Sequence, residues 1–285
     1  MQDRGVNFPL AFERNDSDPF DFAVRVERFY AALMQTASAG SVTDAEPGLG
    51  GKLLYVADLC PRGRALVVAA NIAGAASLIA SADLPAQKQA VRDGVVDFLV
   101  TSLDEAVRIL KNEIRKRETV AVCVAAAPEA VECEMLERGV LPDLLSPAAS
   151  RGSNDDAFLK QGGRRVETGA MNENRVFVAW QVDAAPARWL PQIDAIALDG
   201  LDANDLFSRR WMRLAPRFLG HLAQGIHLLA ADRESAERLV DAIHNEVGCG
   251  NIPVPVEILV RGPGAQPEHR LRLEKPLEPP IQSTS

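Results

Sequence analysis

The sequence has no long apolar run and few aromatic residues. No segment of about 18 consecutive apolar residues is present, which excludes a membrane-spanning helix of the usual kind. Residues 1–14 carry no apolar stretch after their charges, so the sequence predicts no signal peptide. Aromatic residues make up only 5%, while alanine and valine are plentiful, so we expect a core of small and β-branched side chains. We therefore expect a cytoplasmic, soluble protein with no membrane partner.

The sequence also lacks an excess of positive charge. Its formal net charge of -8 is the opposite of what binding to a phosphate backbone requires. One basic cluster occupies residues 111–117, but it contains Glu113, and we expect it on the solvated face of a helix and not in a nucleic-acid patch. The sequence therefore predicts no nucleic-acid partner.

Cysteine and histidine do not occur at metal-ligand spacing. The four cysteines lack any Cys-x-x-Cys pair and are expected to be reduced thiols, neither disulfides nor zinc ligands. Their positions are Cys60, Cys123, Cys133 and Cys249. His221 and His227 flank a predicted strand and have no cysteine or acidic partner at suitable spacing, so we predict no metal site.

Short apolar runs alternate with amphipathic segments from Lys52 onward. The predicted strands are residues 53–57, 76–80, 95–100 and 120–124. Helix boundaries are marked by an N-cap at Asp83, by Ser102 and Glu105 at capping-box spacing, and by Pro128 and Gly139 at the two ends of one helix. This alternation predicts an α/β fold with a Rossmann-like, doubly wound parallel sheet.

The 285 residues are enough for more than one unit. We predict an N-terminal helix and linker over residues 1–50, with the helix at Phe20–Thr36, and a Rossmann-like domain over 51–165. A second, smaller α/β unit is predicted over 170–261, followed by a Pro-rich tail at 262–285, much of which we expect to be disordered or loosely attached. Candidate strands of the second unit are residues 175–182, 193–198, 225–231 and 254–260.

Several motifs between Gly51 and Leu145 occur in the order and spacing of one known family. They are Gly-Lys-Leu at 51–53, Ala-Ala-Asn-Ile-Ala-Gly-Ala at 69–75, Thr-Ser-Leu-Asp-Glu-Ala at 101–106 and Glu-Arg-Gly-Val-Leu-Pro-Asp at 137–143. Together they resemble the NAD-binding domain of urocanase (urocanate hydratase). The resemblance implies a dimeric enzyme of histidine breakdown that adds water to urocanate, using a tightly bound NAD+ as the electrophile.

The sequence departs from that family at the pyrophosphate-binding turn. The family's Gly-Leu-Gly-Gly-x-Gly-Gly-Ala-Gln is replaced by residues 58–66, in which Gly63 is the one glycine retained. Pro61 removes a backbone N–H group from a loop that would donate to phosphate. Cys60 and Arg64 add side chains where the pyrophosphate needs close approach to the backbone.

Three further family features are missing. Ser81 occupies the place of the acidic residue that binds a ribose in the family. Asp83, two residues later, could replace that carboxylate, but we expect it to serve as the N-cap of its helix. Ala126-Ala127 replaces Gly-Asn, and residues 146–151 replace a polar loop that contacts substrate and nicotinamide. We therefore predict a vestigial cofactor site at Gly63, Arg62, Arg64, Ser81 and Asp83, and expect no bound NAD.

No catalytic residue is predicted. Urocanases are about twice as long, and their glycine-rich segments with the catalytic cysteine have no counterpart here. Cys249 lies between two glycines, and His244 is five residues earlier. Such a pair suits a nucleophile and its base, but we expect a helix end followed by a loop.

Five aspartates lie near predicted turns. We expect them to cap helices or to stabilise turns, and the alternative is that two of them form a carboxylate pair. They are Asp183, Asp194, Asp199, Asp202 and Asp205.

Three hypotheses about function follow. The first is a non-catalytic, urocanase-like scaffold or association subunit that forms a homodimer or pairs with a urocanase-type partner. The second is a nucleotide- or anion-binding module that uses Arg62, Arg64 and helix N-termini. The third is an active hydro-lyase with relocated catalytic groups. A ligand-sized polar cleft at the carboxyl ends of the strands favours the second, and convergent titratable residues in such a cleft favour the third.

Overall fold

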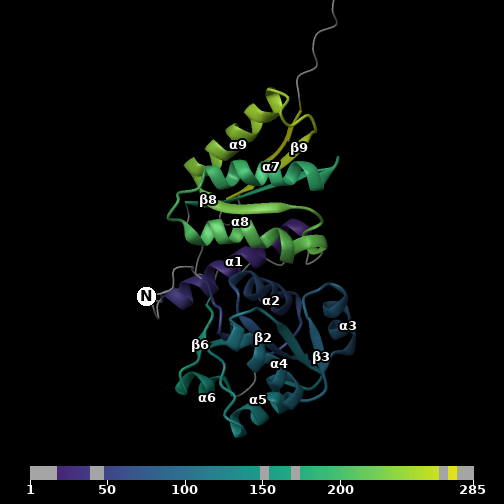
Figure 1. Cartoon of the computed structure of the whole chain (residues 1–285), viewed down its shortest axis with the longest axis vertical. Coiled ribbons are helices and arrows are strands. Elements are labelled where there is room, and N and C mark those ends of the chain that lie inside the picture. Colours follow the sequence, from purple (N-terminus) through teal and green to yellow (C-terminus); the bar gives the residue numbers. More distant parts are fainter. Residues whose placement is uncertain (1–17, 39–47, 148–153, 168–173, 263–268, 275–285) are drawn as a thin grey trace, which may run out of the picture.

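The computed structural model describes residues 18–38, 48–147, 154–167, 174–262 and 269–274. These residues form two sheets, one above the other in Figure 1, with helices between them and on their outer faces. The lower sheet belongs to the N-terminal half of the chain and the upper sheet to the C-terminal half.

The lower sheet is parallel and has the order β3-β4-β2-β1-β5-β6. Its strands are β1 Leu53–Val56, β2 Ala76–Ala80, β3 Phe98–Val100, β4 Ala121–Val124, β5 Leu144–Leu145 and β6 Arg164–Arg165. In β1, β2 and β4 every residue is buried, as expected for parallel strands covered on both faces. The prediction of a Rossmann-like parallel sheet is confirmed.

The helices of this sheet cover it on both faces. Helices α2 (Pro61–Ala73) and α3 (Leu84–Arg92) lie on one face, and α4 (Leu103–Lys116), α5 (Pro128–Glu137) and α6 (Asp155–Lys160) lie on the other. The chain moves outward from β1 to β2 and then β3, and returns through β4 to β5. Because parallel crossovers are right-handed, this reversal of direction places the later helices on the opposite face.

The predicted helix ends are confirmed with one difference. Asp83 Oδ1 accepts from the N–H of Ala86 at 3.1 Å, and Ser102 Oγ accepts from the N–H of Glu105 at 3.3 Å. The Glu105 carboxylate accepts from the N–H of Thr101 at 3.1 Å, one residue earlier than a standard capping box. The predicted strand 95–100 begins only at Phe98, because the N–H groups of Val95 and Val96 bond to Ala90 O at the end of α3.

The upper sheet is antiparallel and has the order β10-β9-β7-β8. Its strands are β7 Arg175–Val182, β8 His227–Asp232, β9 Val256–Arg261 and β10 His269–Leu273. Its helices are α7 Pro186–Asp199, α8 Leu206–Leu219 and α9 Arg233–Gly248, with a 3-10 turn η1 at Gly220–Ala223. This sheet with its helices is the second, smaller α/β unit.

One expectation for this region is wrong. Residues 193–198 form part of α7 and not a strand, since Ile193 and Ala197, four positions apart, share one buried face of a helix. One strand was not predicted: within the Pro-rich tail, residues 269–273 form β10 and pair with β9 from His269↔Val260 to Leu273↔Val256. The remainder of that tail after Gly262 lies outside the described residues, apart from Glu274.

Helix α1 (Pro19–Ser38) lies between the two sheets (Figure 1). It packs on α2 on one side and on β8 and α8 on the other. Helix α2 is buried from Ala65 to Ala73 and is rich in alanine, so α1 and the sheet approach it closely from opposite sides. The same continuous core therefore includes α2, α1 and the upper sheet.

Glu27 on α1 is buried and pairs with Arg175 on β7, their atoms Oε1 and Nη2 lying 3.2 Å apart. Burial raises the pKa of Glu27 from 4.5 to about 6, although the positive charges of Arg175 and Arg28 act in the opposite direction. A carboxyl group whose pKa is raised by folding stabilises the folded state below pH 4.5, and this contribution is lost as the pH rises through about 6.

We therefore expect the Glu27→Gln variant to gain stability relative to the wild-type protein as the pH rises. The shift from 4.5 to about 6 corresponds to about 2 kcal/mol of relative gain between pH 4 and pH 7. Urea unfolding of both proteins at closely spaced pH values measures the difference, in which the contributions of other titrating groups cancel. A difference that stays constant with pH contradicts the expectation.

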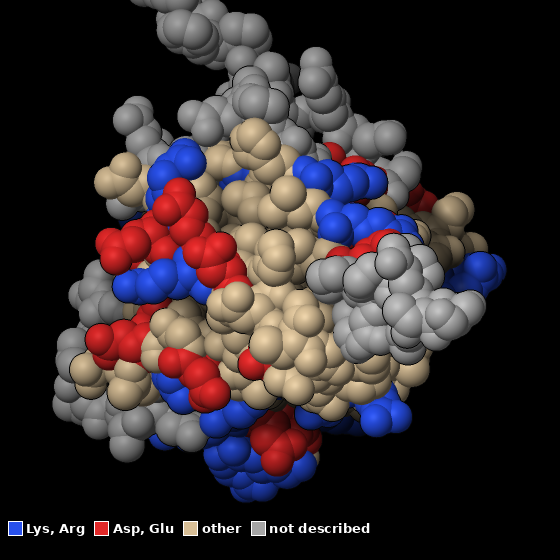
Figure 2. All heavy atoms as spheres, turned by 90° about the horizontal axis from the view of Figure 1, so that it is seen from above, with Lys and Arg blue, Asp and Glu red and all other residues tan. Residues whose placement is uncertain are grey.

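The described surface carries charges of both signs. Seen from above, over the upper unit, acidic and basic side chains surround an uncharged band and are interspersed (Figure 2). This face differs from the continuous basic surface that binds a phosphate backbone. None of the described helices combines the length and apolar character that a membrane-spanning segment requires.

Candidate functional site

The candidate site lies at the carboxyl ends of β1 and β5. β2 and β5 lie on opposite sides of β1: the chain leaves β1 toward β2 through α2 on one face of the sheet, and it reaches β5 from β4 through α5 on the other face. In open α/β sheets this reversal point is where ligands bind. A hollow of about 30 Å³ lies here, little more than the space of a water molecule. Its lining residues are Phe29, Val56, Ala57, Asp58, Cys60, Arg62, Gly63, Leu66, Ser146 and Pro147.

The N-terminus of α2 faces this hollow but has few free N–H groups to offer. Pro61, the first helical residue, has none. The N–H of Gly63 donates to Cys60 Sγ at 3.4 Å, and the N–H of Arg64 donates to Cys60 O at 2.9 Å. The side chain of Cys60 therefore caps the helix where a phosphate would sit in a dinucleotide fold.

Gly63 is needed by the loop itself. A Cβ atom at this position would lie well inside 3.0 Å of the backbone oxygen of Asp58. The loop from β1 to α2 thus passes against the helix at the one glycine that the sequence retains. This close approach explains Gly63 without any ligand.

The two arginines of the loop have different environments. Arg64 forms an ion pair with Asp93 at the end of α3, away from the hollow. Burial acts to raise the pKa of Asp93, but hydrogen bonds from Gln89 and Arg64 hold it below its ordinary value. Arg62 is exposed and lines the hollow. The pKa of nearby Arg28 is lowered, mainly because Arg28 is partly buried and to a smaller extent because of the positive charge of Arg62.

Ser81 and Asp83, the candidates for ribose binding, are committed to the backbone. Ser81 is 5% exposed, and its Oγ accepts from the N–H of Asp83 at 3.2 Å. Asp83 caps α3 through its carboxylate, which confirms its predicted capping role. Neither residue lines the hollow at the strand ends.

A family model described as the urocanase Rossmann-like domain matches residues 30–176, a little over half of the chain. The match covers every strand of the parallel sheet and its helices, together with the end of α1 and the start of β7. The chain belongs to the urocanase family. This family is related to histidine breakdown, and the motifs between Gly51 and Leu145 had indicated the same family.

The residues of this urocanase-family chain do not fit NAD. A dinucleotide needs several hundred cubic ångströms, and the hollow holds about 30 Å³. Phe29 of α1, 3% exposed, closes one side of it, and Asp58 places a carboxylate beside the position of the pyrophosphate. Ser146 and Pro147 line the hollow, while the rest of the predicted replacement loop, residues 148–151, lies outside the described residues.

The other sequence candidates have structural roles. Cys249 is exposed at the end of α9, as expected of a helix end, and no hydrogen bond joins it to His244 within the described residues. Asp205 caps α8 through the N–H of Ser208 at 3.0 Å, and Asp202 accepts from the N–H of Asn204 at 2.7 Å. Both aspartates thus follow the capping and turn interpretation.

The sequence did not reveal one acid–base pair, between Asp194 and His227. Asp194 Oδ1 on α7 lies 2.8 Å from His227 Nδ1 on β8, and it also accepts from Trp180 Nε1 at 3.0 Å. The two residues are 33 positions apart, which no local spacing rule detects. Neither residue lines the hollow at the strand ends, so this pair does not complete the candidate site.

Proposed function

We propose that this protein is a non-catalytic member of the urocanase family that neither binds NAD nor hydrates urocanate. Its role would be that of a scaffold or association subunit, either as a cytoplasmic homodimer or with a urocanase-type partner. The observation that carries the proposal is the hollow at the ends of β1 and β5, which is about 30 Å³ and is lined by Phe29, Cys60 and Pro147.

Retention of the core supports an association role. The strands β1, β2 and β4 and the helix α2 keep a fully packed interior, while the loops that would bind the cofactor have changed. Packing positions preserve a fold, and loops carry the activity. A protein with this combination can still present the outer surfaces of the fold to another subunit.

The test is native mass spectrometry of the purified full chain, followed by calorimetric titration with NAD+ and a urocanate hydration assay. We expect no NAD in the released small molecules, a dissociation constant weaker than about 1 mM, and no hydration above the uncatalysed rate. An active urocanase with the complete glycine loop serves as the positive control. Stoichiometric NAD would overturn the proposal, and the measured mass would test the dimer.

An anion-binding module is the second candidate, favoured by the proximity of Arg62 and Arg28 near the start of α2. Arg64 takes no part in it, because its guanidinium is paired with Asp93. This candidate requires saturable binding of pyrophosphate that Arg62→Ala abolishes and Arg64→Ala, the matched control, leaves in place. Equal and unsaturable binding by all three proteins would exclude it.

A further inference from the structure

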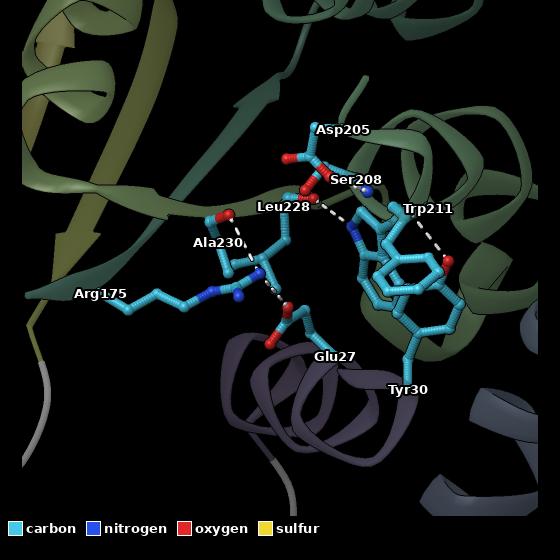
Figure 3. Close-up of polar contacts among 9 residues, drawn as sticks. Glu27, Tyr30, Arg175, Asp205, Ser208, Trp211, Leu228 and Ala230 are labelled. Atoms are coloured by element: carbon cyan, nitrogen blue, oxygen red, sulfur yellow. Dashed lines mark hydrogen bonds and ion pairs between the residues drawn. The ribbon is translucent and has the colours of Figure 1, made fainter. Parts of the chain in front are cut away.

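Two carboxyl groups are buried among the described residues, and their surroundings differ. Glu27 has a cation beside it, since Arg175 reaches toward it from β7 (Figure 3). Glu132 on α5 is 2% exposed and forms no ion pair within the part of the chain that the structure describes. Because a buried carboxylate without a cation is costly, the neutral form of Glu132 is favoured.

Glu132 lies between strand β1 and the start of helix α6. Its Oε1 accepts from the hydroxyl of Tyr55 at 3.2 Å, and its Oε2 accepts at 3.5 Å from Nδ2 of Asn154, the residue that precedes α6. Both contacts are long, since a hydroxyl that donates to an ionised carboxylate usually lies at about 2.5–2.7 Å. The surroundings of Glu132 therefore suit a neutral carboxyl group better than a charged one.

Two other carboxylates act on Glu132 from α5 and α6. Burial is the largest influence and raises the pKa of Glu132, and the charges of Asp155 on α6 and Glu129 on α5 raise it further. The hydrogen bonds from Tyr55 and Asn154 act in the opposite direction and are outweighed. Ionisation of Glu132 thus creates repulsion between α5 and the first residue of α6.

Two cations of neighbouring elements are paired with other carboxylates. Arg165 on β6 is paired with Asp155, its Nη2 lying 2.9 Å from Oδ2. Arg138, which follows α5, is paired with Asp104 on α4 and with Glu134 on α5 itself. Neither arginine compensates a charge on Glu132 by an ion pair.

Helix α6 is short, and one of its side chains is buried. It has six residues, Asp155–Lys160, of which Phe158 lies in the core with its ring centroid 6.2 Å from that of Tyr55. A charge on Glu132 needs water around it. Movement of this six-residue helix away from α5 admits water at a smaller cost than any opening of the parallel sheet.

We propose that the contact between Glu132 and the start of α6 is a pH-sensitive switch, in which neutral Glu132 holds α6 against α5 and ionised Glu132 loosens α6 while the sheet stays folded. A carboxyl group whose pKa is raised by docking favours the docked state fully below its ordinary pKa of 4.5, and this contribution is lost as the pH rises through the raised value. The switch is independent of the proposed function, because it requires neither NAD nor the strand-end hollow.

Hydrogen exchange of the full chain, measured by mass spectrometry from about pH 5 to about pH 8 and corrected for intrinsic exchange, reports the opening of α6. Peptides that cover residues 155–163 should lose protection at least about fivefold as the pH rises, while peptides of α3 keep theirs. Glu132→Gln keeps a neutral group of nearly the same shape at every pH. In this variant the protection of α6 should stay constant within about twofold.

Two further variants keep the test decisive. Glu137→Gln is the matched control, since Glu137 is exposed at the end of the same helix, and it should leave the pH dependence of α6 unchanged. Asp155→Asn removes a charge that raises the pKa of Glu132, so the loss of protection should begin at a lower pH. Protection of α6 that is constant with pH in the wild-type protein, or that falls equally in Glu132→Gln or in α3, would overturn the proposal.

Discussion

Replacing Trp180 with alanine is expected to lower the free energy of unfolding by about 3–5 kcal/mol, the largest single-residue effect that we predict. Trp180 is 0% exposed and lies on β7, which is paired on both sides by β8 and β9. Its indole fills the core beneath α7, and its Nε1 donates to Asp194. The alanine variant loses this packing and leaves Asp194 with one donor fewer.

The Trp180→Phe variant separates the two contributions. It keeps most of the buried ring and removes the N–H donor, so a loss of about 1–2 kcal/mol is expected. Urea unfolding followed by circular dichroism measures both variants. A loss below about 1 kcal/mol in the alanine variant would contradict the packing argument. Because the core is continuous from α2 through α1 to the upper sheet, we also expect a single transition.

Replacing Gly63 with alanine is expected to cost about 3 kcal/mol, at the upper end of the usual range for overpacking. The added Cβ would collide with the backbone oxygen of Asp58, and a backbone atom cannot move aside as a flexible side chain can. Either the loop before α2 or the helix itself must shift. The shift would also disturb the hydrogen bond from Gly63 to Cys60 Sγ.

Gly248→Ala is the matched control for that variant. Gly248 ends α9, and a Cβ there would meet nothing within 4 Å. Its effect should stay within about 0.5 kcal/mol, or be slightly stabilising, since alanine favours helix more than glycine. Thermal and urea unfolding of the two variants measure the contrast. Equal stability of Gly63→Ala and wild type would mean that the loop has room for a side chain, and the structural explanation for Gly63 would fail.

Local patterns were sufficient for most of the parallel sheet. The all-apolar runs at β1, β2 and β4 and the caps at Asp83 and Ser102 act over a few residues, so the sequence shows them directly. Residues 193–198 were misassigned because a short apolar run fits both a buried strand and a helix face. The strand β10 was missed because its pairing with β9, and not its own composition, stabilises it.

The candidate site was predictable only in part. The loss of glycines between Asp58 and Leu66 indicated a changed phosphate loop, and the structure shows Cys60 and Pro61 at the start of α2. The position of Phe29 at the hollow could not be predicted, because it depends on how α1 packs on α2. The same holds for the pairing of Arg64 with Asp93, which are 29 residues apart.

The sequence by itself determined the family, the order of strands and helices in the parallel unit, and the absence of the glycine-rich turn, because each of these is written in contiguous residues. Only the tertiary structure decided how α1 closes the strand-end hollow, how His227 meets Asp194, and how Glu27 comes to face Arg175 across 148 residues. These contacts depend on the close packing of elements far apart in the chain, and packing depends on the shapes of all partners together.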